Sequence, residues 1–184
     1  MPMAHAGQPS NSRKEKMTAA ELLAQQIDDT RDWTLRIIAD FDGDDWSFQP
    51  SPGMGHALWL CGHLACAQYL LVHQRCLQQP DVLDASFLER FPIGGPIKAA
   101  TEFDYPPPET IQREMARIHA ATVTAVRGMS DDLLAEPCYG ADGRTPHPHY
   151  KDKAGAVSHC SRHEAFHAGQ LATIRRLLGK QFLR

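Results

Sequence analysis

The residues with the clearest chemical potential are two histidines near the C-terminus. His163 and His167 are four residues apart, so on an α-helix they lie one turn apart on the same face. Two imidazoles held in this way by one rigid helix can bind a single metal ion. A catalytic site of this kind takes three protein ligands and keeps one position open, so the rest of the chain must supply a third ligand.

His63 is the best candidate for that third ligand. It lies in the middle of a segment, from about His56 to Leu77, in which apolar residues cover most of the helical circumference, as is typical of a buried helix. An imidazole placed there loses its hydration unless its nitrogens find partners. A divalent metal bound by His63, His163 and His167 would provide them. Zinc, nickel, iron and copper all accept imidazole ligands, so the ligand set alone does not select the metal.

Two other interpretations of the histidine pair have to be weighed. The chain has 10 histidines, and a pair at this spacing often lies on a solvated face. The segment His163-Glu164-Ala165-Phe166-His167 also matches the zinc-peptidase motif, in which the glutamate is the general base. Such peptidases take their third ligand from downstream, but residues 168–184 contain no His, Asp or Glu. We therefore expect Glu164 to face Arg162 or solvent, or to hold a metal ligand in place.

Composition excludes several classes of protein. The 184 residues suit one domain, and 19 basic against 22 acidic side chains give a net charge of −3, which provides no surface for nucleic acid. Five cysteines without a CxxC pair indicate free thiols in a reducing cytosol. No segment is apolar enough to span a membrane, and residues 1–16 lack the apolar run of an export signal. We expect a flexible tail over residues 1–16, one domain over residues 17–184, a cytoplasmic location and no membrane partner.

Periodicity predicts an all-α protein built as a four-helix bundle. The first helix opens with a capping box at Thr18 and Glu21 and ends near Phe41, and the second is the segment around His63. The third follows the prolines at 106–108, and the fourth runs from about Asp152 to Gly179. The connection over residues 78–106 is long and aperiodic, which favours a lid or a crossover and frees the third helix to run parallel to the second.

The remaining polar residues and thiols receive weaker assignments. His159 could line the pocket or support the metal site, whereas His56 is expected at the bundle mouth, His147 and His149 in an exposed loop, and His73 and His119 at the surface or an edge. Cys66 and Cys160 are small buried thiols, which are more often core than catalytic. Gln26, Thr30 and Thr122 could face a cavity or bond to their own helices.

Three segments carry a resemblance to a known family. They are Trp46 to Gly53 with its two prolines, Gly62-His63-Leu64, and His163-Glu-x-x-His167-x-Gly169-Gln170 continuing to Gly179. From Met17 to Lys180 the chain resembles the DinB-like (damage-inducible) superfamily of metal-binding four-helix bundles. The resemblance implies an up-down-down-up bundle whose metal, often nickel or zinc, is held by His63, His163 and His167.

The same resemblance guides the functional expectation. Relatives include transferases and isomerases that use low-molecular-weight thiols, and dimers are common among them. Two departures, Gly55-His56 in place of a Ser or Thr cap and Ala168 in place of an Arg, leave the metal ligands intact but weaken any inference about shared substrates.

We expect a metal-dependent thiol S-transferase or hydrolase that acts on a small electrophilic molecule in a pocket roofed by residues 78–106. The alternative is a non-catalytic, metal-stabilised binding or stress-response module, which a fourth protein ligand from Cys160 or His159 would favour. We also expect a homodimer, formed through the exposed side of the second helix.

Overall fold

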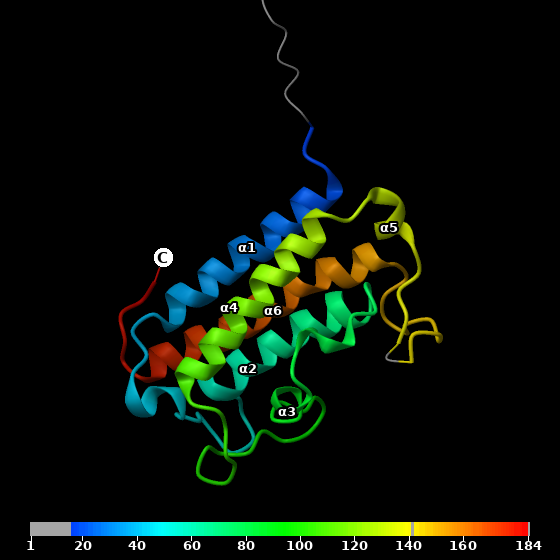
Figure 1. Cartoon of the computed structure of the whole chain (residues 1–184). Coiled ribbons are helices and arrows are strands. Elements are labelled where there is room, and N and C mark those ends of the chain that lie inside the picture. Colours follow the sequence, from blue (N-terminus) through cyan, green and yellow to red (C-terminus); the bar gives the residue numbers. More distant parts are fainter. Residues whose placement is uncertain (1–15, 141, 184) are drawn as a thin grey trace, which may run out of the picture.

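The computed structural model describes residues 16–140 and 142–183, and its body is a set of four long helices (Figure 1). These are α1 (Ala19–Ile38), α2 (Ala57–Gln68), α4 (Pro108–Arg127) and α6 (Lys153–Leu177). The described residues contain no β-strand, so the predicted all-α class is confirmed. Of the tail predicted over residues 1–16, all but Lys16 lies outside the described residues.

Each long helix packs mainly against two of the others. α1 and α2 each contact α4 and α6, so α1 and α2 lie at opposite corners of the bundle. Buried apolar side chains fill the space between the helices in two clusters, one around Leu64, Ile118 and Leu171 and the other around Ala24, Val126 and Val157. Among the described residues no helix is both long and apolar enough to cross a membrane.

The first helix begins as predicted, and its buried face includes polar residues. Thr18 Oγ1 accepts a hydrogen bond from the Glu21 amide, and the Glu21 carboxylate accepts one from the Thr18 amide, which is the predicted capping box. Ala20, Ala24, Ile27, Arg31, Thr34 and Ile38 form the buried face. Thr30, predicted as a possible cavity residue, instead donates to the carbonyl of exposed Gln26 in its own helix.

The second helix starts with an unusual cap. His56 is fully buried, and its Nδ1 accepts a hydrogen bond from the Trp59 amide, so the imidazole performs the capping role of a Ser or Thr side chain. Its Nε2 lies 3.1 Å from the carbonyl oxygen of Lys98, to which it donates. The predicted position of His56 at an open bundle mouth is therefore wrong, because the connection between α2 and α4 covers it.

The predicted helix from His56 to Leu77 changes its winding half-way. α2 ends at Gln68 and continues as η2 (Tyr69–Gln74), a π-helix. Every residue of α2 is buried within the monomer, so Ala57–Gln68 has no exposed side that could form the expected dimer surface; the homodimer itself stays a prediction.

The connection over residues 78–106 covers α2. It contains η3 (Pro80–Val82) and α3 (Ala85–Leu88), and Leu83, Phe87 and Phe91 lie in the core. A backbone bridge from Ile97 to Gly53 ties it to the loop before α2. Because it buries aromatic side chains, this connection is part of the core and not a loose lid.

Gly62 marks the tightest contact between the connection and α2, and it lies next to His63. A Cβ atom at this position would lie 2.1 Å from the Phe91 ring, so only glycine lets the ring pack against the helix. We expect Gly62→Ala to lower the free energy of unfolding by about 1–3 kcal/mol. In urea unfolding, the double variant Gly62→Ala/Phe91→Leu should lose less stability than the sum of the losses in the two single variants, because the ring that the new Cβ would meet is gone. A loss in the double variant equal to that sum would contradict the contact.

Candidate metal centre

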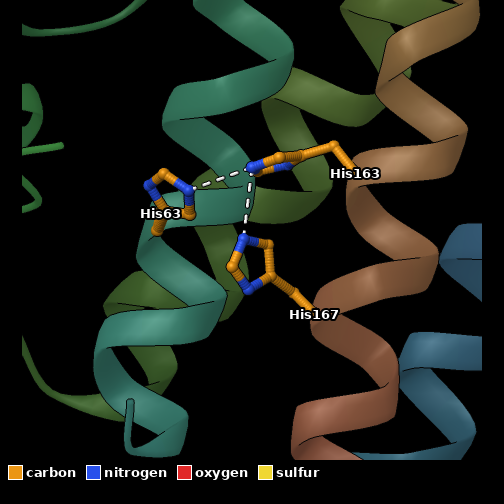
Figure 2. Close-up of side chains that lie close together, drawn as sticks. All are labelled: His63, His163 and His167. Carbon is orange, nitrogen blue, oxygen red and sulfur yellow. Dashed lines mark hydrogen bonds between the residues drawn. The ribbon is translucent and has the colours of Figure 1, made fainter. Parts of the chain in front are cut away.

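Three imidazoles meet between α2 and α6 (Figure 2). His63 extends from α2, and His163 and His167 extend from successive turns of α6 (Figure 2). The Nε2 of His163 lies 3.2 Å from the Nε2 of His63 and 3.2 Å from the Nε2 of His167. One nitrogen of each residue falls within 4.8 Å of the others, so this cluster could hold a metal ion.

Hydrogen bonding alone does not satisfy the cluster. The Nδ1 of His167 lies 2.7 Å from Oε1 of Gln170, so Nδ1 carries the hydrogen of the neutral ring and Nε2 presents a lone pair. The Nε2 of His163 faces two nitrogens and can donate to only one of them. A metal ion accepts all three lone pairs at once, and tetrahedral coordination with zinc–nitrogen bonds of about 2.0–2.1 Å separates the nitrogens by about 3.3 Å. The residues therefore fit a metal of this kind.

Burial keeps the three rings neutral. Loss of hydration, reinforced by the charge that His167 would carry, lowers the pKa of His63 to about 4. Loss of hydration, followed by the effects of His167, His63 and His159, lowers the pKa of His163 to about 3. Burial also lowers the pKa of His167, although the hydrogen bond that its Nδ1 donates to Gln170 opposes this. Neutral imidazole is the form that binds metals, so the site needs no deprotonation at pH 7.

Neighbouring side chains fix the orientation of the rings. The Trp59 indole stacks on His63 with ring centroids 4.5 Å apart and an interplanar angle of 12°. Gln170 holds His167 through Nδ1. Such support sets the tautomer and direction of a metal ligand. The Nδ1 of His63 is buried and has no hydrogen-bond partner among the described residues, so this ring is oriented by the Trp59 stacking and by the contact of its Nε2 with His163.

Cavities open on two sides of the cluster and differ in chemistry. The first, which we call the Arg75 cavity, has a volume of about 250 Å³ and reaches His63 and His163. Its wall combines apolar side chains with polar groups, among them those of Arg75, Tyr150 and His159. The second, the apolar cavity, measures about 330 Å³ and reaches His167. Its wall includes Met54, Trp59, Ile97 and Ile174.

Two segments frame the cavities. The connection over residues 78–106 contributes Ile93 to the Arg75 cavity and Ile97 to the apolar cavity, which agrees with the predicted roof. The loop before α6 was expected to be exposed, yet His147, His149 and Tyr150 line the Arg75 cavity. His147 is half-buried and stacks on Tyr150 at 4.5 Å, while His149 is exposed.

Glu164 lies where the sequence did not predict it. It is 1% exposed and forms an ion pair with Arg31 of α1, which is 2% exposed. Arg31 Nε donates to Oε1 at 2.6 Å, and Gln68 Nε2 donates to Oε2 at 3.0 Å. The expectation that Glu164 faces Arg162 or solvent, or holds a metal ligand, is therefore wrong. With both oxygens engaged inside the bundle, Glu164 cannot serve as the general base of a peptidase.

Of the other histidines considered from the sequence, one lines a cavity and two are buried or half-buried between the helices. His159 lines the Arg75 cavity, with its ring centroid 5.6 Å from that of His163. His73, expected at the surface or an edge, is buried, and its Nε2 lies 3.2 Å from the hydroxyl of buried Thr122. His119 is half-buried and contacts Asp28. Cys66 and Cys160 are core residues, and burial raises the pKa of Cys66 to about 12.

A family model described as the DinB superfamily matches residues 26–171. The chain belongs to the DinB superfamily. None of the curated proteins compared with it matches. The DinB segment contains all three clustered histidines and both members of the Arg31–Glu164 pair.

Sequence reasoning missed several residues of this DinB site. Gln170 was named in the motif, but its contact with His167 was not predicted, although residues three apart meet on a helix. Arg31 could also have been found, because its spacing from Ile27 and Thr34 places it on the buried stripe of α1. Trp59 belongs to the apolar segment around His63 but has no feature that marks it as a ring partner, and Arg75 has no local sequence signal.

A substitution in the Arg31–Glu164 pair should change the stability of the fold without changing metal binding. Glu164→Gln leaves the Arg31 charge buried without a counter-ion, so we expect the free energy of unfolding to fall by about 3–5 kcal/mol. If the variant folds at low temperature, it should still bind one equivalent of metal, because Glu164 does not contact the metal cluster. Urea unfolding and metal analysis measure the two effects. A stable variant that has lost its metal would contradict this assignment.

The low pKa values of the cluster predict acid sensitivity of the metal-free protein. Unfolded histidine has a pKa of about 6.5, whereas the folded values are about 4 for His63 and about 3 for His163. Between the unfolded and the folded pKa values the unfolded chain binds more protons than the folded chain, so the free energy of unfolding falls as the pH falls.

Other buried histidines add to that slope, so the matched comparison is with His163→Gln. From pH 7 to pH 5 the metal-free wild type should lose about 1–2 kcal/mol more than this variant in urea unfolding. Parallel pH profiles for the two proteins would show that His163 is not held neutral by the fold.

Proposed function

We propose that the protein is a metal-dependent enzyme that transfers a low-molecular-weight thiol to a small electrophilic molecule, or hydrolyses that molecule. His63, His163 and His167 would hold the metal, which by family resemblance is zinc or nickel. The observation that carries the proposal is the position of the cluster, where three neutral imidazole nitrogens meet between two cavities, one of which contains the Arg75 charge.

A metal ion in this position lowers the pKa of a bound thiol or water and so supplies a nucleophile at neutral pH. The chain's own residues orient and shield the reacting groups. Trp59 and Gln170 fix the rings of His63 and His167. In transfer, the thiol loses its proton, a carbon–sulfur bond forms at the electrophile, and the bond to the leaving group breaks with its electron pair.

The number of ligands favours catalysis over a purely structural metal. The cluster within residues 16–140 and 142–183 has three members, whereas structural zinc sites are closed by four protein ligands. Cys160 is no fourth ligand, because its Sγ faces the Ala156 carbonyl of its own helix, and His159 lies outside the cluster. These facts speak against the non-catalytic binding or stress-response module.

The proposal extends to the arrangement and setting of the bundle. We propose that the helices run up-down-down-up. Arg31 meets Glu164 near the middle of α1 and α6, and Arg175 meets the Ile37 carbonyl near their C-terminal ends, which supports parallel directions for this pair. Trp59 lies beside His167 and His63 beside His163, which supports opposite directions for α2 and α6.

A cytoplasmic homodimer is the proposed form of the enzyme. Five cysteines are all reduced and buried, which suits a reducing compartment. Exposed apolar side chains on α1 and α6, among them Trp33 and Phe166, could supply a dimer surface in place of α2.

Turnover of thiols by the metal-loaded protein tests the function. Wild type carrying its native metal is incubated with glutathione, bacillithiol or mycothiol and a panel of electrophiles, and thioether formation is followed by mass spectrometry. We expect His167→Ala to lower the rate at least about 100-fold, because a metal ligand is lost. The control is Arg36→Ala, whose side chain is exposed on α1 and lines neither cavity. If no substrate reacts faster with wild type than with His167→Ala, the catalytic proposal fails.

A further inference from the structure

Arg75 is an inward-facing arginine without a partner. The buried arginines of the bundle are paired: Arg31 with Glu164, and Arg175 with Asp40. The half-buried Arg75 side chain forms no hydrogen bond or ion pair within the described part of the chain, and its Nε is buried without a partner. Partial burial of an uncompensated charge is costly, so an arginine in this state is suited to bind an anion supplied from outside.

The chain around Arg75 directs it into a cavity. Arg75 follows the π-helix η2, and π-helical turns inside helices occur frequently at functional sites. It lines the Arg75 cavity together with Tyr150 and His159, and none of the residues lining this cavity is acidic. Burial raises the pKa of Tyr150 and lowers that of His159, and the Arg75 charge is close enough to act on both, opposing the first shift and adding to the second.

The adjoining hollow is also positively charged. It measures about 770 Å³, shares Tyr150, His159 and His163 with the Arg75 cavity, and adds Lys151 and Arg162. Its one acidic residue, Asp152, uses Oδ1 to cap α6 at the Gly155 amide. A chain with a net charge of −3 thus gathers three basic side chains beside its metal cluster. This concentration of charge attracts an anionic ligand.

We propose that Arg75 binds an oxyanion, a carboxylate or a phosphate, at one end of the small molecule whose reactive atom lies at the histidine cluster. The planar guanidinium can donate two parallel hydrogen bonds to either group. The anion site itself stands on Arg75 and its cavity, whereas its coupling to the cluster rests on the proposed thiol chemistry. The two parts are tested separately.

The anion site is tested without metal or turnover. Nuclear magnetic resonance follows the arginine Nε–H signals of the metal-free protein while glutarate or phosphate is added at constant ionic strength, with chloride as the reference. The Arg75 signal is assigned by its absence from the spectrum of Arg75→Lys. We expect a saturable shift of this signal with at least one of the two anions, and none for exposed Arg36. The anion that saturates at lower concentration identifies a carboxylate or a phosphate site.

Coupling to the cluster is tested with thiols of graded length. Calorimetry compares the binding of ω-mercaptocarboxylates and ω-mercaptoalcohols of equal chain length to the zinc-loaded protein. At one length the carboxylate should bind about tenfold more tightly than the alcohol, as a charged hydrogen-bonded pair provides. Arg75→Gln should abolish this preference, and Arg36→Gln should keep it.

The outcomes separate the two proposals. Absence of a saturable Arg75 shift overturns the anion site, whatever the enzyme does. A shift without binding of any thiol supports the anion site and overturns the thiol chemistry. Thiol binding with the same preference in wild type and Arg75→Gln overturns the role of Arg75 in holding the substrate.

Discussion

The buried ion pair between Arg31 and Glu164 joins all four long helices directly behind the histidine cluster. Arg31 of α1 also donates to the Met115 carbonyl of α4 at 3.0 Å, and Gln68 of α2 donates to Glu164 of α6. Such a pair contributes little net stability, because desolvation offsets the attraction, but a wrong helix register would leave both charges unpaired. Since Glu164 directly follows His163, the register that satisfies the pair also sets the height of the α6 histidines against His63.

The cluster depends on this frame for its chemistry. Desolvation keeps the imidazoles neutral, and only a fixed register brings the Nε2 of His163 to 3.2 Å from the Nε2 atoms of both His63 and His167. The two cavities beside the cluster have different walls. Trp59 and Ile97 give one cavity an apolar surface, while Arg75 gives the other a positive charge. A metal held between unlike cavities suits a reaction between two unlike molecules, a polar thiol and a less polar electrophile.

Short sequence patterns predicted the features that depend on residues close to one another in the chain. The Thr18 capping box, the prolines before α4 and the buried setting of His63 could all be read within a few turns of helix. The features that failed depend on distant partners. Glu164 was misplaced because its partner Arg31 lies 133 residues away in the sequence, on another helix. The chain around His56 gives no sign that residues near Lys98 will cover it, since an aperiodic connection does not reveal what it packs against.

The central claim is an open three-histidine metal site, and X-ray absorption spectroscopy of the metal-loaded protein tests it most directly. The account predicts three imidazole nitrogens and one exchangeable oxygen or nitrogen around the metal, with that fourth ligand replaced by sulfur when a thiol is added. His63→Ala should remove one imidazole from the spectrum. A fourth protein ligand that persists in the presence of thiol, or a spectrum unchanged in His63→Ala, would contradict the account.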